Sequence, residues 1–346
     1  LLESITDNAG NAIHYLYDAE GNRTREEVRD AGGMLQKYVD YEHNAFNRLW
    51  KVLYPGDGSP YEEYLYDGND NLTGFRNANG HVTEYLYDAL DRLESEIRPG
   101  TVTTGFDHDA ADNLTLVTDP GANTTVYTHD DLGRTTQVDS PDAGITVYGH
   151  DPAGNVTART DANGITVTYG YDALNRLISA SFPGGGEDLA FGYDAGAYGK
   201  GRLTSAADTA GSTIFTYDAL GRVTEEARVT DGVSYATGYA YSPTTGDLTG
   251  MSYPTGLTLT FQRDGVGRIS AITAGGQTIA GNVAYLPFGP VEAMDLGAVS
   301  VTRSHDARYQ MTGIQAGTAL NYTYTRDGMG NITGLGGAPK PPFKIR

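Results

Sequence analysis

The chain has 346 residues, of which 39% are hydrophobic, and its aromatic residues are mostly tyrosine: 25 Tyr against 9 Phe and 1 Trp. Its formal net charge of −20 argues against binding to nucleic acids or to anionic membranes, because both recruit basic patches. The absence of cysteine excludes disulfides and thiolate metal sites, and no apolar stretch approaches the roughly 20 residues of a membrane-spanning helix.

A motif of eight residues, of the form Tyr-Asp-x-x-Gly-Arg-Leu-Thr, recurs along the chain. With its tyrosine as position 0, the motif starts at residues 17, 43, 66, 87, 108, 129, 150, 171, 193, 217, 241, 263, 285, 305 and 326. Six consecutive units, from Tyr66 to Tyr171, are 21 residues apart. A fixed period of this kind indicates a repeat architecture, in which recurring residues build a scaffold and not one active site.

Each unit is predicted to begin with a strand that has one aromatic face. In the eleven regular units, position −2 is always Tyr or Phe, and position 0 is Tyr, His or Arg. Because side chains alternate along a strand, these two positions share a face, whereas the opposite face is mainly polar. The aromatic residues that we expect to contact a sugar ring, if the chain binds glycans, are Tyr64, Tyr85, Tyr127, Tyr148 and Tyr169.

This strand is predicted to end in a tight turn. Position +1 is Asp in ten of the eleven regular units, and its carboxylate can accept backbone N–H groups within the turn. Position +4 is Gly, Asn or Asp, the residues that tolerate positive φ, which fits a type I turn closed by a bulge. The predicted structural turn residues are Asp67, Asp88, Asp109, Asp130, Asp151, Asp172, Asp218, Gly133, Gly154 and Gly221.

A second strand and a second turn complete each unit. Position +5 is Arg or Asn and position +6 is mostly apolar, and a Gly-rich turn such as Asn163-Gly164 leads to the next unit. With no helical periodicity, the sequence predicts an all-β fold: an antiparallel β-hairpin ribbon that curls into a spiral or hollow shell, since a flat ribbon would leave its aromatic face in water. A β-propeller is the alternative, because two 21-residue units match one blade.

The repeat pattern sets the domain organisation. We assign residues 1–334 to one repeat segment of about 15 units, and residues 335–346 to a linker, a tail or a cloning remnant. The chain starts without Met and in the middle of the pattern, so we expect it to be an excised piece of a longer protein.

No reaction centre or metal site stands out. Equivalent positions in adjacent units lie about 9.6 Å apart, which is too far for two side chains to share a zinc ion, so we interpret the histidines at position 0 as wall residues. The 44 acidic residues contain no pair that stands apart as catalytic. The segment that begins at Asp67 lacks the Gly at loop position 6 and the Glu at loop position 12 that an EF-hand requires. We therefore predict no catalytic residue, no metal and no cofactor. The histidines at position 0 are His43, His108, His129, His150 and His305.

The motif itself resembles a known family. Tyr-Asp-Ala-Leu-Gly-Arg-Val-Thr at 217–224, Tyr-Asp-Ala-Leu-Asn-Arg-Leu at 171–177 and Tyr-Asp-Ala-Leu-Asp-Arg-Leu at 87–93 resemble the YD repeats of bacterial Rhs proteins, of cocoon-forming toxin-complex subunits and of teneurins. The resemblance covers roughly residues 1–334. It implies a spiralling β-sheet that forms a hollow shell, which in Rhs and toxin-complex proteins encloses a C-terminal toxic polypeptide and in teneurins supports cell–cell recognition.

Other parts of the family pattern are missing. The cleavage segment Asp-Pro-x-Gly-Leu that follows such shells is not found, because residues 151–154 form an ordinary repeat turn. We therefore expect a non-enzymatic wall segment of an Rhs-type shell, with a toxin or other polypeptide cargo from the parent protein as its partner and a secreted or cell-surface location on a bacterium. The alternative is a carbohydrate- or cell-surface-binding repeat module. No nucleic-acid partner and no membrane insertion are expected.

Overall fold

The computed structural model describes residues 1–56 and 61–337, and these residues form 31 β-strands and no helix. The chain divides into two compact units. Unit 1 contains residues 1–85, 98–100 and 259–346, and unit 2 contains residues 86–97 and 101–258. The all-β prediction is confirmed, and the described part of the chain accordingly offers no helix with the length and apolar character to span a membrane.

The strands that lie wholly or mostly in unit 1 are β1 (Ser4–Thr6), β2 (Ala12–Tyr17), β3 (Arg23–Arg29), β4 (Leu35–His43), β5 (Leu49–Leu53), β6 (Tyr61–Tyr66), β7 (Leu72–Arg76), β8 (Val82–Tyr87), β24 (Thr258–Arg263), β25 (Ile269–Ala274), β26 (Gln277–Tyr285), β27 (Val291–Leu296), β28 (Val299–His305), β29 (Met311–Ala316), β30 (Leu320–Arg326) and β31 (Ile332–Gly336). Those of unit 2 are β9 (Leu93–Arg98), β10 (Val102–His108), β11 (Leu114–Thr118), β12 (Thr124–His129), β13 (Thr135–Ser140), β14 (Gly144–His150), β15 (Val156–Thr160), β16 (Thr166–Tyr171), β17 (Leu177–Ser181), β18 (Leu189–Tyr193), β19 (Leu203–Asp208), β20 (Gly211–Tyr217), β21 (Val223–Thr230), β22 (Val233–Tyr241) and β23 (Leu248–Ser252). Of the predicted tail, residues 338–346 lie outside the described residues.

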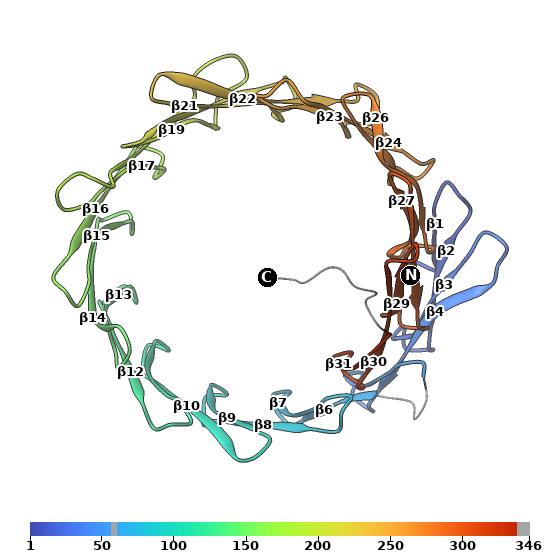
Figure 1. Cartoon of the computed structure of the whole chain (residues 1–346). Coiled ribbons are helices and arrows are strands. Elements are labelled where there is room, and N and C mark those ends of the chain that lie inside the picture. The colour runs from blue at the N-terminus through green and yellow to red at the C-terminus, as the bar shows by residue number, and fades with distance from the viewer. Residues whose placement is uncertain (57–60, 338–346) are drawn as a thin grey trace. The chain divides into compact units, whose positions relative to one another are not determined.

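Within each unit, strands pair antiparallel with the strand that follows them in the chain, as β1 to β8 and β24 to β31 do in unit 1. In unit 2 this pairing runs without a break from β10 to β23. A propeller blade would end after four strands, so the propeller alternative is wrong and the hairpin ribbon is confirmed. Figure 1 shows that this ribbon is a single layer, with no helix on either face.

The repeat also contains a regularly spaced β-bulge. The register shifts by one residue just before position 0, for example between Thr128 and His129 and between Gly149 and His150. A bulge of this kind bends the strand and increases its right-handed twist. Because it recurs once per unit, the bend is built into the repeat itself.

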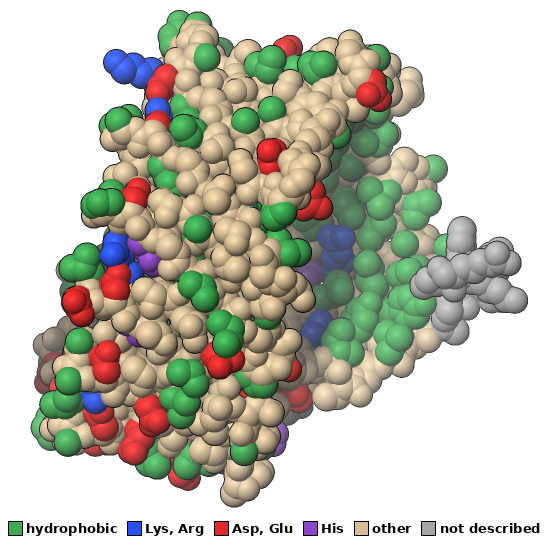
Figure 2. Space-filling model, turned by 90° about the vertical axis from the view of Figure 1, so that its left-hand side faces the viewer, with side chains coloured by type: hydrophobic (Ala, Val, Ile, Leu, Met, Phe, Trp, Pro, Cys, Tyr) green, Lys and Arg blue, Asp and Glu red, His purple; other side chains and the backbone are tan. Residues whose placement is uncertain are grey.

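The ribbon has a thin core. Among the described residues, the buried hydrophobic side chains are small: Val28, Val52, Val167, Ala180, Ala280 and Val301. No large side chain is fully buried in the described part of the chain. On the face nearest the viewer in Figure 2, which carries β14–β17, apolar side chains are scattered among acidic ones, with few basic ones. Burial of apolar surface therefore cannot be the main source of order, and the polar groups of the repeat must supply much of it.

Within unit 1, strands from both ends of the chain lie side by side. Figure 1 shows β1–β4 next to β27 and β29, and the ammonium of Lys37 on β4 lies 5.6 Å from the ring centroid of Tyr309. The first and last repeats thus contact each other, although some 250 residues separate residues such as Asn79 and Asp327.

Position +4 of the motif turn gives a test of the backbone conformation. Gly154 has φ of +92°, and a Cβ added there would meet no atom within 4 Å, so a substitution probes backbone strain without a steric clash. We expect Gly154→Val to cost more than about 1 kcal/mol of unfolding free energy, because a β-branched residue is strained at positive φ. Urea denaturation followed by circular dichroism would measure this cost.

The matched control for that substitution is Gly154→Asn. Asn47 and Asn175 occupy the same position in other units with φ of 60° and 59°, so Asn fits the conformation. We expect a much smaller loss for Asn than for Val. Equal losses for the two variants would contradict the turn geometry.

Candidate functional site: a ladder of tyrosine, aspartate and arginine

The aspartate at position +1 is bound within its own turn. In Asp130, Oδ1 accepts the backbone N–H groups of Leu132 at 2.9 Å and of Arg134 at 3.0 Å, while Oδ2 accepts Nε–H of Arg134 at 2.7 Å. Where position +5 is Asn, its amide replaces the guanidinium, as in the 2.9 Å bond from Asn113 Nδ2 to Asp109 Oδ2. Both carboxylate oxygens are used in either case.

The other predicted turn aspartates make the same contacts. Oδ1 accepts the backbone N–H of position +5 in Asp67, Asp88, Asp109, Asp151, Asp172 and Asp218. Of the predicted glycines, Gly133, Gly154 and Gly221 have φ of 73°, 92° and 79°, and each donates its N–H to the carbonyl of the turn aspartate. Each of these residues is therefore engaged in a turn, and Asp109, Asp130 and Gly133 also line one open depression.

These contacts hold the aspartates in the ionised state. The guanidinium of Arg92 lowers the pKa of Asp88 to about 2, and that of Arg134 lowers the pKa of Asp130 to about 2. The side-chain amide of Asn71 lowers the pKa of Asp67, with the backbone N–H groups of the turn adding to the effect. Charged groups with low pKa values make poor proton donors at neutral pH, so the turn aspartates are unsuited to general acid catalysis.

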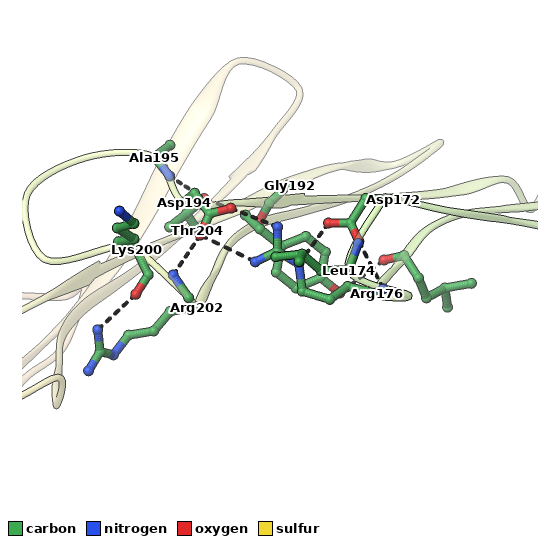
Figure 3. A network of polar contacts seen from close by, with 12 residues as sticks. Asp172, Leu174, Arg176, Gly192, Asp194, Ala195, Lys200, Arg202 and Thr204 are labelled. Carbon is green, nitrogen blue, oxygen red and sulfur yellow. Dashed lines mark hydrogen bonds and ion pairs between the residues drawn. The ribbon is translucent and has the colours of Figure 1, made fainter. Parts of the chain in front are cut away.

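The arginine at position +5 also reaches into the next unit. Arg176 binds Asp172 of its own turn at 2.7 Å, and its Nη2 donates to Asp194 Oδ2 of the following unit at 2.7 Å (Figure 3). Its guanidinium also lies 4.3 Å from the ring centroid of Tyr193. Arg134 similarly donates from Nη1 to the carbonyl oxygen of Asp151 at 2.8 Å. Each such arginine therefore ties two neighbouring turns together.

The tyrosine at position 0 also connects its unit to the preceding unit. The hydroxyl of Tyr171 donates to the carbonyl oxygen of Val156 at 2.9 Å, and that of Tyr193 donates to the carbonyl oxygen of Leu177 at 2.9 Å. In each pair the acceptor is position +6 of the preceding unit. We call this repeated set of Tyr, Asp and Arg or Asn contacts the YDR ladder.

Sequence reasoning missed two parts of the YDR ladder. The tyrosines at position 0 and the arginines at position +5 were recognised as recurrent, but they were interpreted only as wall and strand residues. Their recurrence together, in Tyr-Asp-x-x-Gly-Arg, was the available signal. The motif does not show that an arginine side chain is long enough to reach the next unit.

The tyrosines predicted to form an aromatic face are half-buried against neighbouring strands. Tyr64 pairs with Phe75, with ring centroids 5.2 Å apart, and burial raises its pKa. The remaining four are Tyr85, Tyr127, Tyr148 and Tyr169. In the strand pairing, Tyr127 lies opposite Val138, Tyr148 opposite Arg159 and Tyr169 opposite Ala180. The rings thus pack on cross-strand neighbours.

One open depression involves these groups. It has a volume of about 740 Å³ and is lined by Tyr127, His129, Asp109, Asn113 and other residues of two adjacent units. A ring face next to oxygen and nitrogen groups can contact a polar, planar or cyclic ligand. Within residues 1–56 and 61–337, no group of three or more His, Asp or Glu is placed to hold a metal ion.

A protein-family model matches part of the chain. The model described as RHS Repeat matches residues 66–104, 108–145, 150–187 and 198–234. No curated protein matches the chain.

Several solved structures have the same fold. The chain is similar to the crystal structure of TcdB2-TccC3-Cdc42, with 16% identity and a TM-score of 0.78 over 94% of this chain and 20% of that one. It is also similar to the crystal structure of TcdB2-TccC3, with 15% identity and a TM-score of 0.70 over 96% of this chain and 23% of that one. A structure of the Photorhabdus luminescens Tc holotoxin pore with a mutated TccC3 has 15% identity and a TM-score of 0.66, with coverage of 96% and 23%. The chain thus spans about a fifth of the length of these proteins, and at such identities the likeness shows the fold alone.

The contribution of the YDR ladder can be measured at Arg176. We expect Arg176→Lys to lower the urea midpoint of unfolding, because an ammonium cannot hold Asp172 and Asp194 together as a planar guanidinium does. Arg159→Lys is the matched control, since Arg159 is exposed in mid-strand and makes no such tie. A control variant as unstable as Arg176→Lys would contradict a special role for position +5.

The lowered pKa values predict how stability depends on pH. The pKa values of Asp88 and Asp130 lie near 2 in the folded chain, below the ordinary value of 3.8. Their contribution to stability is therefore complete above about pH 4 and is lost as the pH falls towards about 2. We expect the urea midpoint to fall steeply over this interval and to change little between about pH 5 and pH 7. A midpoint that stays constant down to about pH 2 would contradict the ladder as a source of stability.

Proposed function

We propose that the chain is a wall segment of an Rhs-type shell that encloses a C-terminal toxin or other polypeptide of its parent protein, on the premise that four consecutive stretches match the RHS Repeat model. The segment has no reaction of its own in this proposal. A secreted or cell-surface location on a bacterium follows from the same premise.

The observation that carries the proposal is the use of the motif residues. The hydroxyl of Tyr193, the carboxylate of Asp172 and the guanidinium of Arg176 all bind neighbouring parts of the ribbon. An active site needs at least one reactive group that is free to contact a substrate. Repeated groups that are all bound to neighbouring turns build a continuous wall instead.

The likeness in fold supports the same role. The similar structures include complexes of TcdB2 with TccC3, and the match covers at least 94% of this chain. A ribbon with this fold, a single layer thick and without a large core of its own, is suited to separating two compartments. The cargo in this proposal is a polypeptide of the parent protein.

A second function is favoured by the depression at Tyr127. There the tyrosine lies with His129, Asp109 and Asn113 in a space large enough for one sugar ring. Carbohydrate binding, as a cell-surface recognition module, is therefore the alternative proposal. Strong, saturable binding in a glycan screen that is lost in Tyr127→Ala would favour it over enclosure.

Protease protection of the parent protein tests enclosure. We expect its C-terminal polypeptide to resist digestion in the native protein and to become accessible when Arg134→Lys and Arg176→Lys break two ties of the wall. Limited proteolysis followed by mass spectrometry would map the accessible bonds. Arg159→Lys is the control and should leave protection intact. A C-terminal polypeptide that is digested equally fast in the unmodified parent would overturn the proposal.

A further inference from the structure

Two side chains meet in the space between consecutive motif turns of the YDR ladder. One is the residue at position +5 of the earlier turn, and the other is the residue at position 0 of the next unit. Arg176, for example, reaches from Asp172 of its own turn to Asp194 of the next turn (Figure 3), and its guanidinium lies 4.3 Å from the ring centroid of Tyr193. We call each such region an inter-turn space.

Most inter-turn spaces of unit 2 contain at least one long side chain. Where position 0 is the shorter His150, position +5 of the preceding unit is Arg134. Where position +5 is the shorter Asn155, position 0 of the next unit is Tyr171, whose hydroxyl reaches the carbonyl oxygen of Val156 at 2.9 Å. A short residue on one side is therefore paired with a long one on the other. The remaining pairs of this kind are Arg92 with His108, Arg176 with Tyr193, Arg222 with Tyr241 and, in the irregular unit that starts at Tyr193, Arg202 with Tyr217.

One inter-turn space has a short side chain on both sides. It lies between the motif turns at residues 109–112 and 130–133, where Asn113 is followed by His129. The amide of Asn113 donates to Asp109 Oδ2 of its own turn at 2.9 Å. Both Asn113 and His129 line the open depression of about 740 Å³. The depression thus lies where the YDR ladder lacks both of its long side chains.

The depression is lined by the same motif positions that hold a guanidinium in the preceding space. There, Nη1 of Arg92 donates to the carbonyl oxygen of Asp109 at 2.7 Å and to the carboxylate of Asp112 at 3.0 Å, which are positions +1 and +4 of the next turn. In the depression these two positions are Asp130 and Gly133. The backbone carbonyl of Asp130 therefore corresponds to an oxygen that accepts an arginine elsewhere in the ladder.

The lining also has the charge that suits a cation. The guanidinium of Arg134 lowers the pKa of Asp130 to about 2, and the side-chain amide of Asn113 lowers the pKa of Asp109, so both carboxylates are ionised at neutral pH. Asp131 is a third acidic residue of the lining. Among the described residues that line the depression, none is Lys or Arg.

We propose that this depression binds the guanidinium group of an arginine side chain from another polypeptide. The bound group would take the place that the chain's own arginine occupies in the neighbouring inter-turn spaces. A guanidinium is planar and carries five N–H donors, whereas a lysine ammonium lacks this flat arrangement. The inference does not rest on enclosure, since two adjacent units are sufficient to form the site. It differs from the carbohydrate alternative in the charge of the ligand.

A titration followed by nuclear magnetic resonance tests the proposal. The chain has seven histidines, so carbon-13 labelling of histidine gives few signals, and His129 lines the depression. We expect N-acetyl-arginine amide to shift the His129 signal saturably and to leave the signal of His150, which follows Arg134, unchanged. The lysine analogue should bind about fivefold more weakly, because it lacks the planar fork. Equal affinities for the two amides, or no shift of His129 at about 50 mM, would overturn the proposal.

A variant that fills the space provides the second test. Asn113→Arg places a guanidinium of the chain itself between the two turns, so we expect it to abolish the effect of the arginine amide on His129 and to raise the urea midpoint. Asn155→Arg is the matched control, since Tyr171 already enters that space, and it should leave binding unchanged. Undiminished affinity in Asn113→Arg, or an equal loss in the control, would contradict the proposal.

A milder variant keeps the test independent of folding. Asp131 is exposed at the second position of its turn, so Asp131→Asn removes one negative charge from the lining with little effect on the turn. We expect the arginine amide to bind about threefold more weakly to this variant at low salt, as attraction between exposed charges is modest. Unchanged affinity would contradict a charged site.

A neutral sugar distinguishes this proposal from carbohydrate binding. Methyl glucoside can lie on the ring of Tyr127 but carries no positive charge for the acidic lining. We expect no shift of the His129 signal at sugar concentrations equal to those at which the arginine amide saturates. A sugar that shifts this signal saturably, while the amide does not, would overturn the proposal in favour of the carbohydrate alternative. Protease protection of the parent protein is a separate measurement, so either inference can fail without the other.

Discussion

The tie between the aspartate that closes each turn and the arginine or asparagine four residues further on recurs along this structure. The carboxylate of Asp172 fixes its own turn and orients Arg176, whose guanidinium then holds Asp194 of the next unit. A single contact thus sets the geometry of a turn and its distance from the following turn. Hydrogen bonds between a planar guanidinium and a carboxylate are both stronger and more directional than hydrogen bonds between neutral groups.

This tie explains how an extended single-layer sheet can be ordered with so few buried side chains. The buried hydrophobic residues are valines and alanines spread along the chain, as at Val52 and Ala180, and not a central cluster. Stability is then a sum of contacts within a unit and contacts between neighbours, as in other repeat proteins. The acidic surface of the ribbon is a consequence of the same design, since nearly every turn requires its aspartate.

Much of the fold could be predicted from the sequence because its determinants are local. The period of 21 residues, the aspartate at position +1 and the glycine at position +4 were sufficient to predict hairpins, and the ladder from β10 to β23 confirms them. The partner of Arg176 could not be predicted from the motif alone, because it depends on how far apart adjacent turns lie. The contact of Asn79 with Asp327 could not be predicted either, since nothing in the repeat distinguishes these residues from their equivalents elsewhere.

The pairing of each strand with its immediate successor has a consequence for biosynthesis. Such pairing gives a low contact order, so a hairpin can form as soon as its two strands have left the ribosome. The ribbon is then laid down from its N-terminal end while translation continues.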